Sequence, residues 1–426
     1  MASARTLAFG LLGRTLGHSW SPQIHASLGS APYALVEKEP ADAESFLREG
    51  SWRGLNVTIP YKRLAADVAD TKSERVERIG VANALVRMPD GSIHAENTDV
   101  LGFSWMLSRF CEQRLDEEAR SALMDGEALV LGTGGAALAV KAAIEDTLGC
   151  PVALVSRKGN DSYEGISERH PRTTLIVNAT PVGMYPDCPQ SPVDDATLAS
   201  FPQLRAVLDA VYNPERTGIC LAAERLGIPS ESGLAMLVAQ AHFSSELFQG
   251  RSLDEGAIEQ TEQRLRLSQR NIILIGMPGA GKTSTGRSLA RSLHRPFIDL
   301  DDAFAVDAGM PAAQYISEKG EPAFRDRESK VTASYGCKSG LVIACGGGVV
   351  TRPENYDAIH QNGTICFIDR PLYQLSSEGR PVSQLKGIER LANERMGLYQ
   401  SWADVHIVCT GSAAGDAQLI RAKLGL

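Results

Sequence analysis

The stretch Gln269–Gly286, QRNIILIGMPGAGKTSTG, decides the fold of the part of the chain that follows it. Asn271–Ile275 is a short apolar run that predicts a strand, and Ser284–Ser292 predicts a helix. Between them, Gly276–Thr283 (GMPGAGKT) matches the pattern G-x-x-x-x-G-K-[ST]. The glycines let successive backbone N–H groups point at phosphate oxygens, and the N-terminus of the next helix favours an anion. The stretch therefore predicts a phosphate-binding loop rather than a glycine-rich turn with a chance lysine.

Two side chains of this loop have specific chemical tasks. Lys282 reaches the β- and γ-phosphates of a nucleotide, and the Thr283 hydroxyl is a ligand for Mg²⁺. The other residues that we expect to line the phosphates are Gly279, Ala280, Gly281 and Ser284.

Composition limits the classes of protein to which the chain can belong. A length of 426 residues predicts two or three domains, and 43% hydrophobic with 22% charged residues is ordinary for a soluble globular protein. A net charge of −8 gives no electrostatic reason to expect nucleic acid or an anionic membrane as a partner. Eight cysteines without a C-x-x-C pair fit reduced thiols. Met1–Gly10 is too short an apolar run for a signal peptide, so we expect a cytoplasmic protein; protein partners are not implied.

The N-terminal region carries two serines whose role the residues leave open. Thr6–Leu11 predicts a strand, and Pro22 is suited to the first turn of a helix. Between them, Ser19 and Ser21 suit the carboxylate of a small polar ligand, but serines in this position also cap helices.

Polar side chains then recur at the predicted ends of strands. Asn56–Ile59 predicts a strand that Pro60 ends, and the segments Gly80–Leu85 and Glu96–Gly102 predict polar loops. A single lysine in a loop is usually a solvated charge, but a lysine together with amide, hydroxyl and carboxylate groups is typical of a site for a polyhydroxylated small molecule. The residues concerned are Thr58, Lys62, Asn83 and Asp99.

The middle of the chain predicts a dinucleotide-binding unit. Ala128–Leu131 predicts a strand, a helix follows to about Leu148, and Val152–Val155 predicts the next parallel strand. The turn between the first strand and the helix contains Gly132, Gly134, Gly135 and Ala136. An NAD enzyme is expected to carry an acidic residue after the second strand, but this chain has Ser156-Arg157-Lys158. Two cations and a hydroxyl fit a 2′-phosphate, which predicts NADP; the alternative is a solvated basic turn.

The C-terminal region adds candidate ligands to the phosphate loop. Pro296–Asp302 predicts a strand that ends in carboxylates, of which either Asp299 or Asp301 suits Mg²⁺ while the other accepts a proton from a substrate hydroxyl. An acidic helix N-terminus is the alternative. Arg325 offers a guanidinium for a carboxylate, and the predicted strand Leu341–Ala344 leads into three glycines.

The first half of the chain resembles the shikimate dehydrogenase family. The motifs that carry the resemblance, in order, are HSWSPQIH, NVTIPYK, VANAL and NTDVLGF. The resemblance implies an α/β substrate domain over 1–100, completed by returning helices in 233–267, and a Rossmann NADP domain over 101–232. It implies that Lys62 and Asp99 are the catalytic pair. The substrate-binding residues it implies are Ser19, Ser21, Thr58, Asn83, Tyr212 and Gln240, and further cofactor contacts are Asn178, Thr180 and Gly233.

Residues 268–426 resemble shikimate kinase, a parallel α/β domain of the P-loop nucleoside-monophosphate-kinase type. The resemblance implies that ATP is the nucleotide and that Thr283 and Asp299 serve Mg²⁺. It also implies that Arg380, in a lid, meets the transferring phosphate beside Lys282, and that Asp301 orients or deprotonates the attacking hydroxyl. The shikimate-binding residues it implies are Asp301, Arg325, Gly347 and Arg395.

Together the resemblances imply a bifunctional enzyme that reduces 3-dehydroshikimate with NADPH and phosphorylates shikimate with ATP. Ser268–Arg270 is the only linker expected between the halves. One alternative is a dehydrogenase that acts on quinate as well as shikimate, because a single hydroxyl separates these substrates. The other is an inactive sensor of quinate, but such a sensor is expected to lose Lys62 or Lys282 and to carry a DNA-binding segment.

Overall fold

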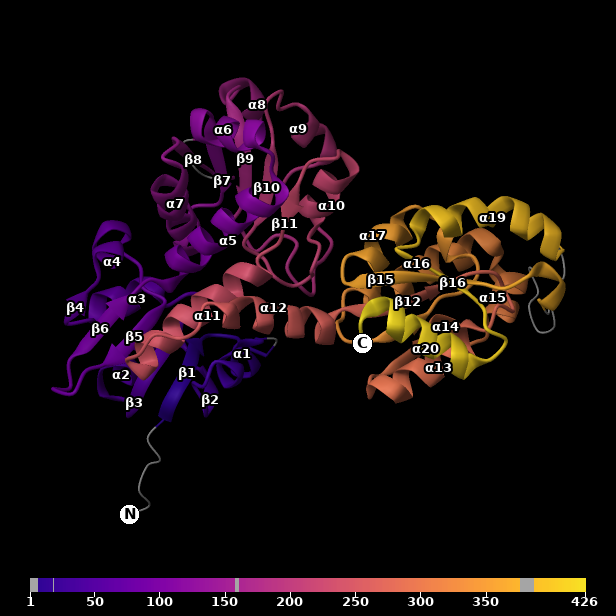
Figure 1. The fold of residues 1–426 in the computed structure, drawn as a ribbon, viewed down its shortest axis with the longest axis horizontal. Coiled ribbons are helices and arrows are strands. Elements are labelled where there is room, and N and C mark those ends of the chain that lie inside the picture. The colour runs from indigo at the N-terminus through magenta and orange to yellow at the C-terminus, as the bar shows by residue number, and fades with distance from the viewer. Residues whose placement is uncertain (1–6, 18, 158–160, 376–386) are drawn as a thin grey trace, which may run out of the picture. The chain divides into compact units, whose positions relative to one another are not determined.

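The computed structural model describes residues 7–17, 19–157, 161–375 and 387–426. The chain folds into two compact units (Figure 1). Unit 1 consists of Met1–Val182, Ser191–Tyr212 and Ala222–Arg264, and unit 2 consists of Gly183–Gln190, Asn213–Leu221 and Leu265–Leu426.

The first sheet of unit 1 is mixed, with strand order β2-β1-β3-β5-β6-β4 among the described residues. Parallel pairing joins β1 to β2 and β3, and antiparallel pairing joins β3, β5 and β6. The strands are β1 (Leu7–Gly13), β2 (Tyr33–Glu37), β3 (Trp52–Val57), β4 (Thr71–Lys72), β5 (Ala84–Arg87) and β6 (Ile93–Glu96). Its helices are α1 (Ser21–Ser27), α2 (Pro40–Glu49), α3 (Lys62–Val68) and α4 (Glu74–Ile79).

The second sheet of unit 1 is parallel throughout its described strands, in the order β11-β10-β9-β7-β8. Strands covered on both faces read as continuous apolar runs, as in Glu127–Leu131 (EALVL). The strands are β7 (Glu127–Leu131), β8 (Val152–Val155), β9 (Thr173–Asn178), β10 (Ala206–Asp209) and β11 (Ser230–Glu231). The helices between residues 98 and 269 are α5 (Thr98–Arg114), α6 (Glu117–Asp125), α7 (Gly135–Leu148), α8 (Ile166–Arg169), α9 (Asp195–Ala199), α10 (Gly218–Arg225), α11 (Leu234–Gln249) and α12 (Gly256–Gln269), of which α10 and α12 each contribute residues to both units.

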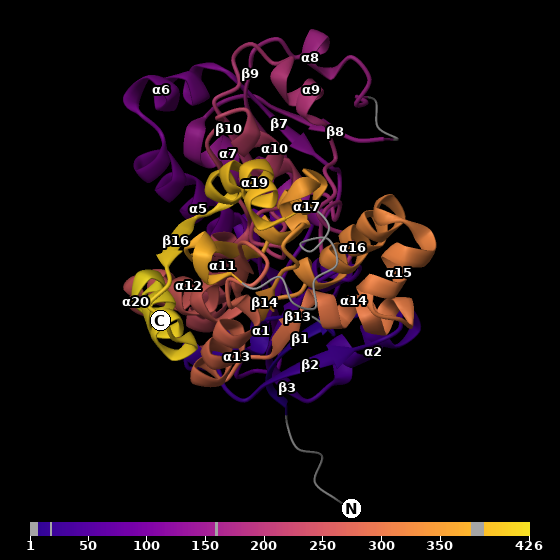
Figure 2. The same cartoon turned by 90° about the vertical axis from the view of Figure 1, so that its right-hand side faces the viewer.

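Unit 2 is built on a parallel sheet with the order β13-β14-β12-β15-β16. The strand that leads into the phosphate loop, β12, is buried along its whole length at the centre of this sheet. Helices α14, α15 and α16 pack on one another (Figure 2). The strands are β12 (Asn271–Ile275), β13 (Phe297–Asp299), β14 (Val342–Ala344), β15 (Gly363–Asp369) and β16 (Val405–Val408). The helices are α13 (Lys282–Leu293), α14 (Leu300–Ala308), α15 (Ala312–Lys319), α16 (Glu321–Gly336), η1 (Val349–Thr351), α17 (Glu354–His360), η2 (Leu372–Gln374), α19 (Ile388–Trp402) and α20 (Ala413–Leu424).

Two acidic segments differ from the expected elements at their boundaries. Asp99, expected in a loop, lies in the first turn of α5, because the Asn97 side chain caps this helix by accepting from the Val100 N–H at 3.2 Å. The strand expected over Pro296–Asp302 ends at Asp299, whose carboxylate accepts from the N–H of residue 301 at 3.0 Å and caps α14. The segment is therefore a short strand, β13, followed directly by a helix whose first turn is acidic.

The expected linker is shorter than the sequence indicates. Helix α12 continues to Gln269 and β12 begins at Asn271, so Arg270 alone separates them. The helix continues beyond its amphipathic pattern. The N–H of Arg270 still donates to the carbonyl of Arg266 at 3.0 Å, which is a helical hydrogen bond.

Unit 2 also includes residues 213–221, which the sequence places in the dinucleotide-binding region. The backbone N–H of Glu215 donates to Asn362 Oδ1 at 2.8 Å, and the N–H of Arg216 donates to the carbonyl of Gln361 at 2.8 Å. The Glu215 carboxylate pairs with Arg270. Burial opposes ionisation, but the neighbouring arginines outweigh it and lower the pKa of Glu215. Through these bonds, residues 213–221 pack with the residues of unit 2.

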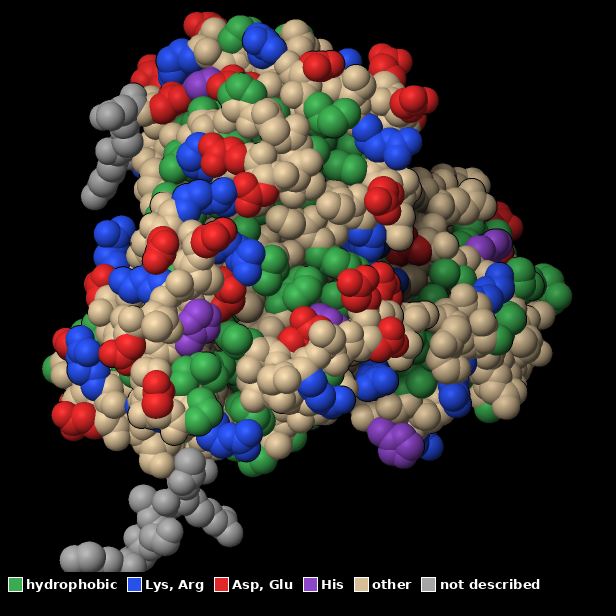
Figure 3. All heavy atoms as spheres, turned by 60° about the vertical axis from the view of Figure 1, so that its left-hand side comes forward, with side chains coloured by type: hydrophobic (Ala, Val, Ile, Leu, Met, Phe, Trp, Pro, Cys, Tyr) green, Lys and Arg blue, Asp and Glu red, His purple; other side chains and the backbone are tan. Residues whose placement is uncertain are grey.

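The described helices include none that is long and apolar enough to cross a membrane. On the face shown in Figure 3, Lys and Arg side chains are interspersed with Asp and Glu side chains. Such a mixture gives no single-sign field on that face.

Candidate active sites

The expected catalytic pair meets at the start of two helices in unit 1. Lys62 is the first residue of α3, and its Nζ donates to Oδ2 of Asp99 at 2.5 Å. Asn83, just before β5, donates from Nδ2 to the other carboxylate oxygen, Oδ1, at 2.8 Å. The Lys62 and Asp99 side chains are 16% and 10% exposed, so the pair is shielded but still reachable from solvent. A cation, a carboxylate and an amide are thus held in one orientation.

Gln240 reaches this group from α11. Its Oε1 lies 3.4 Å from Nδ2 of Asn83, and its Nε2 donates to the carbonyl of Leu237 at 2.9 Å. The close approach of α11 to α5 depends on Gly102, because a Cβ there would lie 2.8 Å from the backbone nitrogen of Gln240. A larger residue at position 102 would push Gln240 away from the pair.

The structure places the two N-terminal serines in one turn at the start of α1. The N-cap of α1 is Trp20, which makes no capping bond with its side chain. Ser19 Oγ instead accepts from the N–H of Ser21 at 3.3 Å, and the two hydroxyls lie 3.1 Å apart. Both hydroxyls therefore belong to one tight turn that leads into the first residue of α1. Beside them, the Trp20 ring lies 5.1 Å from the ring of Tyr212, and burial raises the pKa of this tyrosine.

The glycine turn after β7 lies next to Lys62. Gly132 has φ +123°, and Gly134 is the N-cap of α7. A Cβ added at Gly135 would lie 3.4 Å from Cδ of Lys62. The first turn of α7, which also contains Ala136, presents backbone N–H groups to an anion. The turn therefore fits the pyrophosphate of a dinucleotide beside Lys62.

Other expected cofactor contacts lie at the carboxyl ends of the neighbouring strands. Ser156 and Arg157 follow β8, and Arg157 is exposed; Lys158 lies outside the described residues. Asn178 is fully buried, with its Nδ2 donating to Asp209 at 3.0 Å and its Oδ1 accepting from the Thr180 hydroxyl at 2.7 Å. Asn178 thus fixes the orientation of Thr180.

Gly233 and Thr58 complete the set expected in unit 1. A Cβ at Gly233 would lie 2.3 Å from the carbonyl oxygen of Ala210, so only glycine permits this contact between the loops. Thr58 directly follows β3, and its N–H donates to the carbonyl of Leu12 at 2.9 Å.

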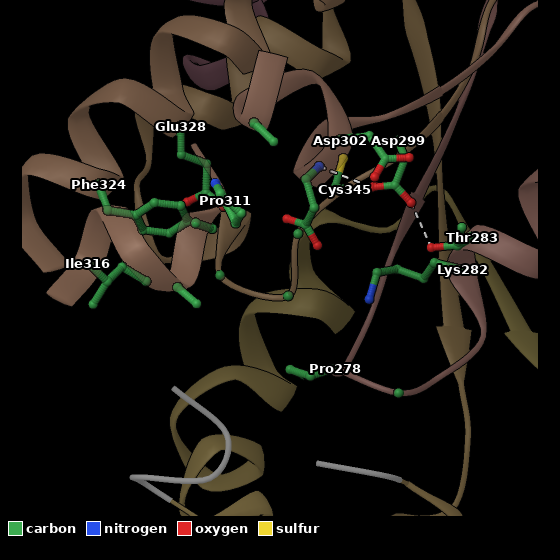
Figure 4. Close-up of a pocket in the computed structure, with 18 of the residues that line it drawn as sticks. Pro278, Lys282, Thr283, Asp299, Asp302, Pro311, Ile316, Phe324, Glu328 and Cys345 are labelled. Atoms are coloured by element: carbon green, nitrogen blue, oxygen red, sulfur yellow. Dashed lines mark hydrogen bonds between the residues drawn. The ribbon is translucent and has the colours of Figure 1, made fainter. Parts of the chain in front are cut away.

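In unit 2, most of the expected kinase residues line one cavity of about 690 Å³ (Figure 4). Ala280 is buried behind the loop, and Arg380 lies outside the described residues. The expected residues that line the cavity are Gly279, Gly281, Lys282, Thr283, Ser284, Asp299, Asp301, Arg325, Gly347 and Arg395.

The phosphate loop presents a cation and hard oxygen ligands to this cavity. Lys282 is 8% exposed, and its Nζ donates to the carbonyls of Gly276 and Met277 at 2.9 and 3.0 Å. The Thr283 hydroxyl donates to Oδ2 of Asp299 at 2.7 Å (Figure 4). A hydroxyl and a carboxylate in contact fit Mg²⁺, which binds oxygen and takes its remaining ligands from water and phosphate.

The glycines after β14 make room for charged groups. A Cβ at Gly348 would lie 2.1 Å from Nη1 of Arg325, and one at Gly346 would lie 2.8 Å from Oδ1 of Asp301. Arg325 donates from Nη1 to Oε2 of Glu328 at 2.6 Å. Burial raises the pKa of Glu328, although Arg325 opposes this change. Sequence reasoning missed Glu328, but its spacing of three residues from Arg325 on α16 was an available signal.

Two further contacts shape the cavity and the loop. Arg395 Nη1 donates to the carbonyl of Gly347 at 2.9 Å, which fixes the glycine segment. Arg370, also missed in the sequence, donates from Nε to the carbonyl of Ala280 at 3.1 Å. Arg370 directly follows β15, so its place beside the loop follows from the order of strands in the sheet.

Comparison with known proteins matches both halves of the chain. The family model for the shikimate dehydrogenase substrate binding domain matches residues 11–85, and the model for shikimate kinase matches residues 278–424. A shikimate dehydrogenase (NADP(+)) of Clostridium perfringens is 34% identical over 282 residues, which cover 61% of this chain and 98% of that protein.

Solved structures give the same picture for the first half. A chorismate mutase/shikimate 5-dehydrogenase fusion protein from Clostridium acetobutylicum is 32% identical, with a TM-score of 0.52 over 61% of this chain and 97% of that one. The shikimate 5-dehydrogenase of Thermus thermophilus, solved with NADP(H) and shikimate, is 30% identical, with a TM-score of 0.50 over 61% of this chain and 99% of that one. The chain belongs to the shikimate dehydrogenase family and continues into a shikimate kinase domain, which makes it a bifunctional, NADP- and ATP-dependent enzyme of the shikimate pathway.

Proposed function

We propose that Lys62 and Asp99 perform the acid–base chemistry of the dehydrogenase. NADPH supplies the hydride for the C3 carbonyl carbon of 3-dehydroshikimate. The Lys62 ammonium, held against Asp99 at 2.5 Å, gives a proton to the carbonyl oxygen, and Asp99 keeps the amine oriented. The proposed substrate-binding residues are Ser19, Ser21, Thr58, Asn83, Tyr212 and Gln240. The observation that supports this proposal most strongly is the junction of Lys62, Asp99 and Asn83 beside the glycine turn.

The cofactor is proposed to lie along the turn after β7. The N-terminus of α7 would hold the pyrophosphate, and Arg157 with its neighbours at the end of β8 would hold the 2′-phosphate. The residues assigned to NADP are Gly132, Gly134, Gly135, Ala136, Ser156, Arg157, Lys158, Asn178, Thr180 and Gly233.

In the kinase, the chain is proposed to act by positioning and charge neutralisation. Lys282 and Arg380 would neutralise the transferring phosphoryl group, and Thr283 with Asp299 would hold Mg²⁺. Asp301 would orient the attacking hydroxyl, while Arg325 and Arg395 bind the shikimate carboxylate. Gly279, Ala280, Gly281 and Ser284 would face the phosphates, and Gly347 the shikimate ring.

The domain boundaries and the compartment are also proposals. We assign 1–100 with 233–267 to the substrate domain, 101–232 to the NADP domain and 268–426 to the kinase. All eight cysteines are free thiols, which supports a reducing compartment such as the cytoplasm.

The assignment is tested with a reciprocal pair of variants, Lys62→Ala and Lys282→Ala. NADP⁺ reduction is followed with shikimate and, separately, with quinate, and phosphorylation is followed with ATP. Lys62→Ala is expected to lower dehydrogenase kcat by about 10²–10⁴-fold, the usual contribution of a placed proton donor, while phosphorylation stays at the wild-type rate. Lys282→Ala is expected to do the reverse. Wild-type dehydrogenase turnover in Lys62→Ala would contradict the proposed pair.

A further inference from the structure

Behind the catalytic pair, a continuous series of hydrogen bonds leads from Asp99 into the interior of unit 1. Asn83, which holds Asp99, also accepts from the N–H of Thr98 at 2.7 Å and donates to the Thr98 hydroxyl at 3.0 Å. That hydroxyl lies 2.9 Å from the hydroxyl of Ser244 on α11. Ser244 in turn accepts from Nδ2 of Asn56 on β3 at 2.8 Å.

The chemistry of the two asparagines fixes the direction of their own bonds in this series, whereas either hydroxyl can donate between Thr98 and Ser244. The N–H of Thr98 can only donate, so Asn83 turns its oxygen toward Thr98 and its amide nitrogen toward the catalytic carboxylate. The Tyr33 hydroxyl donates to Oδ1 of Asn56 at 2.9 Å, which leaves Nδ2 of Asn56 to donate to Ser244. Ser244 therefore uses a lone pair on Asn56, and its single proton is available to Thr98.

The two hydroxyl members behind Asn83 are buried. Thr98 and Ser244 are 1% and 0% exposed. Buried polar groups destabilise a fold unless they are hydrogen-bonded, and apolar residues of the same size would fill this space as well. The effect of these groups on the reaction must therefore pass through the side chains that they orient.

We propose that Ser244 is a positioning residue of the dehydrogenase, which acts on Asp99 through Thr98 and Asn83. This inference rests on the roles proposed for Lys62 and Asp99. Alanine at position 244 removes the hydrogen bond between Ser244 and the Thr98 hydroxyl. The Thr98 hydroxyl, which lies 3.0 Å from Nδ2 of Asn83, then loses the partner that orients it from α11, while the Thr98 N–H still holds the Asn83 oxygen. We therefore expect the Asn83 amide nitrogen to hold the Asp99 carboxylate less firmly, while the other side chains proposed to touch the substrate remain in place.

Such a loss is expected to lower kcat more than substrate binding. A small misplacement of a reacting group lowers rates by up to about 10²-fold, so we expect Ser244→Ala to lower dehydrogenase kcat about tenfold. The KM for shikimate is expected to stay within about twofold, because the other side chains proposed to bind the substrate are unchanged. Ser244→Cys, which keeps a weaker donor in a similar volume, is expected to recover part of the lost kcat.

The chain offers a matched control in the next residue. Ser245 is also fully buried on α11, but its Oγ lies 3.0 Å from Nδ1 of His25 rather than from Thr98. Ser245→Ala therefore removes the same group from the same helix without touching the link to Asn83. The full-length variants are compared for kcat and KM with shikimate and NADP⁺, for thermal unfolding, and for kinase activity as an internal measure of enzyme concentration.

The outcomes separate this inference from the proposed function. A tenfold fall in kcat for Ser244→Ala, with Ser245→Ala within twofold of wild type, supports the inference. Equal kcat values for the two alanine variants at equal melting temperature, or a raised KM with unchanged kcat in Ser244→Ala, would overturn it. If Lys62→Ala keeps wild-type turnover, the proposed function fails first. If Lys62→Ala is inactive but the serine variants are alike, only the role of Ser244 fails.

Discussion

At the scale of single residues, Arg157 is the side chain on which cofactor choice is expected to depend. It follows β8 in an exposed position, where an acidic residue would accept a bond from the 2′-hydroxyl of NAD. We expect Arg157→Asp to lower kcat/KM for NADP⁺ by about tenfold or more and to raise it for NAD⁺, because a carboxylate repels the 2′-phosphate. Steady-state kinetics with both cofactors at fixed shikimate measure the change.

A neighbouring arginine provides the control for this variant. Arg169 is the last residue of α8 and is bound to Asp161 at 2.8 Å, so it is already engaged within unit 1. Arg169→Asp should leave the ratio of the two kcat/KM values unchanged. If Arg157→Asp leaves that ratio unchanged as well, Arg157 points into solvent and the specificity lies elsewhere.

The sequence indicated the residues proposed to touch the substrate better than the residues that hold them in place. Lys62, Asn83 and Asp99 stand in short motifs, and the structure brings them together. Ser244 and Thr98 are 146 residues apart, and a serine within an apolar helix carries no local signal of its partner. Only the packing of α11 on α5 reveals the link.

At the scale of elements, the contact of α1 with β2 and α11 predicts a pH dependence of stability. The His25 ring stacks on Tyr33 with ring centroids 4.0 Å apart, and it is fully buried. Burial lowers the pKa of His25 from 6.5 to about 3, although a bond with Asn56 opposes the change. Below pH 6.5 the unfolded chain binds a proton that the folded unit rejects. The stability from neutral His25 is therefore complete above pH 6.5 and is lost as pH falls toward 3.

The expected loss is measurable at moderate acidity. At pH 5, about 1.5 units below the unfolded pKa, His25 alone should lower the free energy of unfolding by about 2 kcal/mol. Urea unfolding at pH 7 and pH 5 in a Trp402→Phe background restricts tryptophan fluorescence to unit 1. His25→Gln should reduce the difference between the two pH values, and His94→Gln, at a less buried site, should not. An equal pH difference in all three proteins would show that His25 is not the group responsible.

Elements were predictable where the pattern was long and periodic. The strand over Val152–Val155 and the helix ending at Leu148 have the expected bounds. The predicted boundaries were wrong where a side chain caps a helix by accepting from a backbone N–H two or three residues further on. The caps at Asn97 and Asp299 begin helices that hydrophobic patterns do not show. The continuation of α12 through the expected linker was missed because helix ends at polar residues give no apolar signal.

At the scale of the whole molecule, the boundaries of the two compact units differ from the domain boundaries that the order of the motifs predicts. Residues 183–190 and 213–221 lie between dehydrogenase motifs in the sequence but pack in unit 2. Glu215, whose carboxylate pairs with Arg270 there, is three residues beyond Tyr212 in the chain. No local pattern predicts that these loops pack in unit 2, because the residues that bond Glu215 lie about fifty positions or more further along the chain.

The two activities are nevertheless expected to exchange shikimate through the medium. The residues proposed for each reaction come from one half of the chain, and tethering raises local concentration without forming a tunnel. In the coupled reaction, isotopically labelled shikimate added to the medium should therefore mix with shikimate formed from 3-dehydroshikimate. The label in shikimate 3-phosphate should match that of the free pool. An equimolar mixture of the Lys62→Ala and Lys282→Ala proteins is the control, because there the intermediate must leave one molecule to reach another. If the wild-type protein excludes the label while the mixture does not, the intermediate is transferred directly and the expectation of free exchange is wrong.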